Sequence, residues 1–115
     1  MINHEYYLQQ LNLTEMITKK NNVYKIRLNE VQLKNDTPAQ KSIEFEFENH
    51  DDIFNIIDKM QEIDVLGDKG QAVEFALGIK LFSEVLLNHR DHPLFEEMKP
   101  AFAAFMKKLK GMTSR

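Results

Sequence analysis

Two segments of the chain alternate strictly between apolar and polar residues, and this period of two predicts a pair of β-strands. The apolar members are Tyr24, Ile26 and Leu28 in the first segment and Ile43, Phe45 and Phe47 in the second. The polar stretch 34–40 between them predicts a turn. Pairing the strands as a hairpin puts Lys25 and Arg27 on the same face as the glutamates at 44, 46 and 48. Cross-strand charge pairing therefore explains why the three glutamates are there, and no functional role has to be assigned to them.

The apolar period then changes to that of an α-helix. Asn49 or Asp51 is predicted to cap the first helix, whose apolar stripe runs from Ile53 to Ile63. The stretch 66–68 is predicted to end that helix and begin the next, with Asp68 and Gln71 forming a capping box.

The second helical segment, which stops near 91–93, is apolar almost all round and is expected at the centre of the fold. Gly78 in its middle suggests a close backbone crossing. A third helical segment follows from Leu94 to Leu109, with Pro100 as a break or as the first residue (N1) of a new helix and Gly111 as its end.

The order of elements predicts an α+β fold, a β-hairpin followed by three helices (ββααα), with residues 23–110 forming a single domain. Residues 1–22 are expected to be an N-terminal extension in which Tyr7 and Leu11 could lie on a short amphipathic helix, and 111–115 a tail. An isolated hairpin is marginal, so it must pack on the helices or find further strands. Its open edges predict self-association, by strand addition or by pooling helices.

Composition removes several classes of function. The chain has no cysteine, which excludes disulfides, thiol nucleophiles and zinc–thiolate sites. No apolar run approaches the roughly 20 residues that span a bilayer, and the first residues lack a signal-peptide pattern, so a cytoplasmic protein without membrane partners is expected. Nine of the 18 acidic residues fall in 42–68 beside only Lys59, which argues against nucleic acid as a partner.

Few residues suggest chemistry. His89 and His92 lack the i, i+4 spacing of two metal ligands on one helix face, and His92 or Asp91 is expected to cap the next helix. His50 beside Asp51 is expected not to face it, because neighbours at a helix start diverge. No catalytic residue, metal or cofactor is predicted, and an enzyme is the less favoured class.

Five segments resemble a bacterial family of small proteins known as domain of unknown function 3861. The segments are Tyr24–Ile26, Glu44–Phe54, Leu77–Val85, Pro93–Phe95 and Phe105–Lys110. The resemblance extends from Val23 to Lys110 and implies a bacterial, cytosolic protein with no assigned activity. It transfers no catalytic residue.

These observations predict a macromolecular interaction or regulatory module, forming a homodimer and binding a further protein partner. The alternative is an enzyme or small-ligand-binding protein with a pocket between hairpin and helices. Such a ligand would reach Lys80, Glu84 or His89. Of the residues that carry the resemblance, Lys80 is the one that helix capping and close packing explain least.

Overall fold

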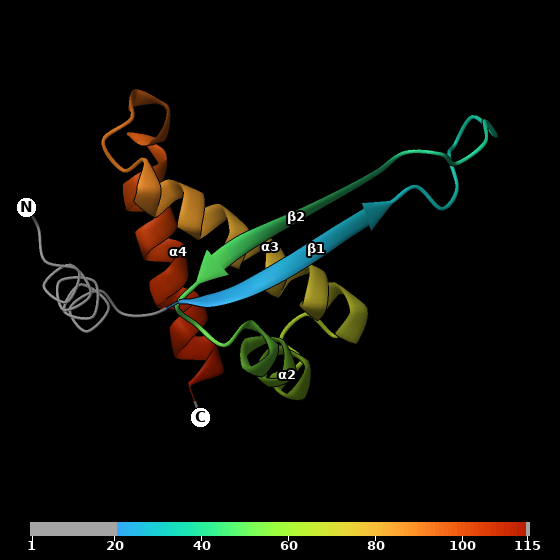
Figure 1. The fold of residues 1–115 in the computed structure, drawn as a ribbon. Helices are drawn as coiled ribbons and strands as arrows, with labels where there is room; N and C mark the ends of the chain where they lie inside the picture. Colours follow the sequence, from blue (N-terminus) through green and yellow to red (C-terminus); the bar gives the residue numbers. More distant parts are fainter. Residues whose placement is uncertain (1–20, 115) are drawn as a thin grey trace, which may run out of the picture. The chain divides into compact units, whose positions relative to one another are not determined.

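A computed structural model describes residues 21–114 and contains an antiparallel hairpin followed by three α-helices (Figure 1). The elements are β1 (Asn22–Asn29), β2 (Ser42–Asn49), α2 (Ile53–Ile63), α3 (Lys69–Asn88), the short 3-10 helix η1 (Pro93–Phe95) and α4 (Met98–Thr113). The predicted α+β fold with the order ββααα is confirmed. The amphipathic helix predicted around Tyr7 and Leu11 lies outside the described residues.

The chain divides into two compact units, one ending at Asp51 and holding the hairpin, the other starting at Asp52 and holding the helices. The single-domain boundary at 23–110 and the pocket between hairpin and helices therefore stay predictions.

The hairpin has the register that the alternating pattern predicts. Lys25 lies opposite Glu46 and Arg27 opposite Glu44, so the charged side chains share one face of the ribbon. Arg27 Nε lies 3.7 Å and Lys25 Nζ 3.9 Å from Glu44 Oε1. Because all three side chains are exposed, each pair contributes at most about 1 kcal/mol. The predicted charge pairing is confirmed as a structural feature.

The other face of the hairpin is apolar. Tyr24 stacks on Phe47 with ring centroids 5.5 Å apart near the base of the ribbon. Towards the tip, Leu28 lies opposite Ile43, and these residues are 66% and 57% exposed. This face therefore presents apolar surface to solvent at its outer half.

Helix α2 begins one residue later than predicted. Asp52, rather than Asn49 or Asp51, is the N-cap, and its side chain accepts the backbone N–H of Asn55 at 3.1 Å. The Asn49 side chain instead accepts the N–H of Asp51 at 2.9 Å, which closes a turn before the helix. The helix ends at Ile63, ahead of the predicted stop, where Asp64 takes the left-handed conformation with φ of 54°.

Helix α3 is capped by Asp68, as predicted. Its side chain accepts the backbone N–H of Gln71 at 3.0 Å, which satisfies one of the donors left open by the first turn.

Replacing Asp68 with alanine is expected to lower the free energy of unfolding by about 1 kcal/mol, because that N–H loses its acceptor. Asp68→Asn keeps an acceptor oxygen at the same position and should retain most of the stability. Urea unfolding followed by circular dichroism compares the two variants. Equal losses would assign the effect to charge rather than to capping.

The core of the helical unit is small and lies between α2 and α3. Met60 packs against Ala72 and Ala76, and all three are buried. Leu109 of α4 packs against the same cluster. Small alanines on α3 let α2 approach closely, so one methionine side chain fills the space between the two helices.

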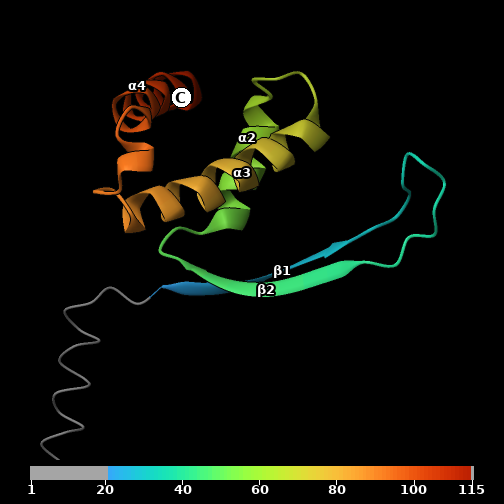
Figure 2. The ribbon, with the colours of Figure 1, turned by 90° about the horizontal axis from the view of Figure 1, so that it is seen from above.

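Aromatic rings hold α4 against α3. Phe75 pairs with Phe105 at 6.1 Å between centroids, and Phe82 pairs with Phe102 at 5.3 Å, so the two helices run antiparallel. Helix α3 thus contacts both α2 and α4 (Figures 1 and 2), and α4 also packs on the α2–α3 cluster through Leu109. Helix α3 is not covered all round, however, because Val85 and Leu87 remain exposed.

The connection between α3 and α4 differs in detail from the sequence prediction. Helix α3 ends at Asn88, before the predicted stop, and the ring nitrogen of His92 accepts the N–H of Leu94, confirming the predicted cap. Pro100 neither breaks nor starts α4, since it occupies the first turn, where an N–H has no helical partner. Gly111 does not end α4, which continues to Thr113.

Gly78 marks no close crossing within the described part of the chain. A Cβ built at this position meets nothing within 4 Å among these residues, so the predicted close approach is wrong here. Gly78→Ala is therefore expected to raise the free energy of unfolding by about 0.5–1 kcal/mol, through helix propensity and a less flexible unfolded chain. Thermal and urea unfolding measure it, and a loss of stability would contradict the open environment.

Candidate functional site

A half-open groove of about 510 Å³ lies among the three α-helices of the second unit. We call it the helical groove. It is lined by Ile56, Lys59 and Met60 of α2, by Phe75, Ala76, Ile79 and Lys80 of α3, and by Met106, Lys107, Leu109, Lys110 and Thr113 of α4. The volume lies within the range of small-molecule sites, roughly 300–1,000 Å³.

The groove follows from the side chains that separate the helices. The Phe75–Phe105 ring pair spaces α4 from α3, because bulky contact residues set a large interaxial distance. Ala76 and its small side chain lie beside Phe75 on α3 and leave space that no other described side chain fills. Large rings next to a small residue therefore produce the hollow.

The floor of the helical groove is apolar. Met60 and Ala76 are its buried part. Half-buried side chains continue it on all three helices: Ile56, Phe75, Ile79, Met106 and Leu109. The hydroxyl of Thr113 already donates to the Leu109 carbonyl at 3.1 Å, so it adds little polarity. The floor offers contact area rather than directional hydrogen bonds.

Four lysines surround this floor, and none of the described residues that line it carries a carboxylate. They are Lys59 of α2, Lys80 of α3, and Lys107 and Lys110 of α4. Helix α4 contains no acidic residue over its whole length. Within the part of the chain described here, Lys59, Lys107 and Lys110 form no ion pair. The groove thus combines an apolar floor with a positive rim.

The structure places the three predicted ligand residues at different points along α3. Lys80 lines the helical groove, whereas Glu84 lies one turn further on and does not line it. His89 is the C-cap of α3, nine residues and about 14 Å along the axis from Lys80. It borders a shallow depression formed by the consecutive residues 87–92. That one ligand reaches Lys80, Glu84 or His89 stays a prediction.

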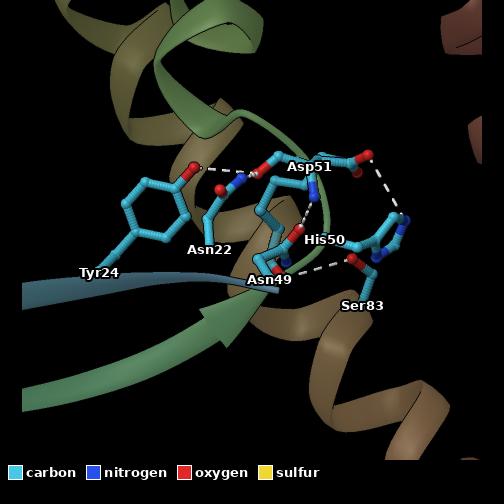
Figure 3. A network of polar contacts seen from close by, with 7 residues as sticks. Asn22, Tyr24, Asn49, His50, Asp51 and Ser83 are labelled. Carbon is cyan, nitrogen blue, oxygen red and sulfur yellow. Dashed lines mark hydrogen bonds and ion pairs between the residues drawn. The ribbon is translucent and has the colours of Figure 1, made fainter. Parts of the chain in front are cut away.

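A polar turn connects the hairpin to the end of its unit. Tyr24 Oη and Asn22 Nδ2 both donate to the Asp51 carbonyl, at 3.0 and 3.2 Å (Figure 3). His50 Nε2 lies 3.4 Å from Asp51 Oδ1, so the expectation that these neighbours diverge is wrong. They converge because both precede the Asp52 cap and belong to a turn rather than to the helix. These contacts hold the turn.

Residues 21–114 contain no group of three or more histidine or acidic side chains placed to hold a metal ion. Over the same range, no helix has the length and apolar character needed to cross a bilayer.

Comparison with known proteins identifies relatives without a known activity. The model of a family described as a domain of unknown function with a solved structure, DUF3861, matches residues 22–111. A crystal structure of a protein of unknown function from Pectobacterium atrosepticum is 35% identical, covers 80% of this chain and 99% of its own, and superposes with a TM-score of 0.68. A search of curated proteins found no match. The predicted resemblance, including its start near Val23, is confirmed.

Proposed function

Because this chain belongs to the DUF3861 family, whose description assigns no activity, we propose a function from geometry: it is an interaction module that takes up an apolar segment of a partner protein in the helical groove. The observation that supports the proposal is the apolar floor contributed by α2, α3 and α4. Such floors between helices are typical of grooves that receive a partner's apolar residues.

The chemistry of the groove favours a macromolecular segment over a small substrate. Small-ligand sites combine an apolar enclosure with a few fixed polar groups that orient the ligand. Here the polar lining consists of flexible lysine side chains and a hydroxyl that already donates to Leu109. Among the described residues, every buried side-chain nitrogen or oxygen already has a hydrogen-bond partner, so none is left for a substrate to satisfy. The groove therefore offers contact area to a bound segment but no fixed polar groups that would orient a reacting group.

A displayed library of helical peptides tests this proposal. Each peptide carries apolar residues at i, i+3, i+4 and i+7 on one face and random residues on the other. Selection on the wild-type protein, with counter-selection on an Ile79→Asp variant, should enrich clones that bind only the wild type. Failure to enrich any clone that distinguishes the two proteins would contradict the proposed function.

We propose that self-association, which the sequence also predicts, uses apolar faces rather than strand edges. When two β2 edges pair about a two-fold axis at Glu46, Glu46 lies opposite Glu46 and, in the same register, Glu44 lies opposite Glu48. Shifting this pairing by one residue places the glutamates of one β2 strand on the same side of the sheet as Phe45 of the other. Sedimentation at high micromolar concentration should show a dimer that survives β2 charge changes. A monomer at that concentration would remove the proposal.

A further inference from the structure

We infer that the segment which the helical groove receives is an acidic amphipathic helix, with its apolar side on the floor and its carboxylates among Lys59, Lys80, Lys107 and Lys110. The inference rests on the proposed function and specifies the chemistry of the partner. The apolar side of such a partner helix would lie on Met60, Ala76 and Leu109. Its negatively charged side would lie along the positive rim of the groove.

The charge argument comes from the origin of the four lysines. They belong to three different helices, so positive charge borders the groove on every helix that forms it. Lys107 and Lys110 are three residues apart and therefore share one face of α4. No carboxylate among the described lining residues offsets these two lysines. A neutral or basic segment would leave this field uncompensated, whereas an acidic one would be attracted and oriented by it.

The backbone argument decides between a helical and an extended segment. The groove walls are helices, whose backbone groups are already bonded internally, and no described strand edge belongs to this unit. An extended peptide there would leave its N–H and C=O groups facing apolar side chains without partners. A helix satisfies its own backbone and presents only side chains, so it fits this surface.

The lysine stems fit the same arrangement. Lys59, Lys107 and Lys110 are exposed, and their aliphatic stems can lie against an incoming helix while the ammonium groups reach its polar side. A fatty acid would supply a single carboxylate to a rim of four lysines. The number and spread of the lysines therefore favour a segment with several acids.

Three matched peptides test the inference on the full-length protein. Each has about 16 residues and the same leucine face, and they differ only in carrying glutamate, glutamine or lysine on the polar face. Fluorescence anisotropy should show the glutamate peptide binding at least about tenfold tighter than the glutamine peptide, and the lysine peptide weakest. Raising NaCl from about 0.05 to 0.5 M should remove most of that difference.

Helix α4 supplies the control variants. Lys110→Glu and the milder Lys110→Gln should weaken the glutamate peptide several-fold, while Lys108→Glu, which makes the same charge change on a lysine that does not line the groove, should have little effect. Equal binding of the glutamate and glutamine peptides overturns the acidic selectivity and leaves the proposed function standing. If none of the peptides binds and laurate does, both proposals are overturned.

Discussion

Replacing Ile79 with aspartate is expected to weaken binding of the glutamine peptide by at least about thirtyfold. Ile79 is half-buried in the floor of the helical groove, and burying such a side chain contributes about 1.5–3 kcal/mol. Aspartate loses this contact and must also be desolvated when the peptide's leucines cover it. Anisotropy titration of wild type and variant measures the change. The uncharged peptide keeps the result independent of the lysine rim.

Val85→Asp is the matched control for that substitution. Val85 lies on the same helix, is 50% exposed and does not line the groove. The same new carboxylate there should change the affinity by less than about twofold, because the peptide does not cover it. Similar losses in both variants would mean that a general effect on α3, and not the groove floor, controls binding.

Met60→Ala is expected to lower the free energy of unfolding of the helical unit by about 2–5 kcal/mol. Met60 is only 6% exposed and fills the space against Ala72 and Ala76, so truncation leaves a cavity that the short alanines cannot fill. In a core this small, that loss is a large share of the total stability. Urea unfolding monitored by circular dichroism at helical wavelengths measures it.

Phe54→Ala serves as the comparison on the same helix. Phe54 is a larger side chain but is 67% exposed, so its truncation removes little packing and should cost less than about 1 kcal/mol. The opposite order of the two losses would show that α2 packs through a different face. The core described here would then be wrong.

Stability and the proposed binding surface share residues. Met60 and Ala76 form the core with Ala72, and they are also the buried floor of the groove. An occupant that covers this floor is expected to stabilise the helical unit, since a ligand that binds only the folded state shifts unfolding by mass action. The small core and the exposed apolar floor are thus two aspects of one packing arrangement.

The hairpin could be predicted from sequence because its signals are local. Alternation over 23–29 and 43–48 fixes which residues share a face, and opposite charges at Lys25, Arg27 and the glutamates agree with the register. The start of α2 was less determined, since three of the four consecutive polar residues at 49–52 can act as a cap. The Asn49 side chain binds the Asp51 N–H, which leaves Asp52 to cap the helix.

The site was only partly predictable. Lys80 stood out because capping and packing did not explain it, and it does line the groove. No sequence prediction gave Lys107 or Lys110 a role, because positive charge near the C-terminus of a helix is favoured by the helix dipole in any case, and their part in the rim was missed. The sequence signal that could have indicated a positive rim on α4 was the absence of acidic residues throughout 98–113. The position of Lys59 beside them depends on tertiary packing through Met60 and Leu109, which no local pattern encodes.

Methyl NMR of the full-length protein with the glutamate peptide tests the central claim most directly. The account predicts that methyl signals of Ile56, Ile79 and Leu109 shift on titration, while those of Leu87 and Leu94, which are exposed outside the groove, stay in place. Shifts confined to Leu87 and Leu94, or spread equally over all five residues, would contradict a binding site in the helical groove.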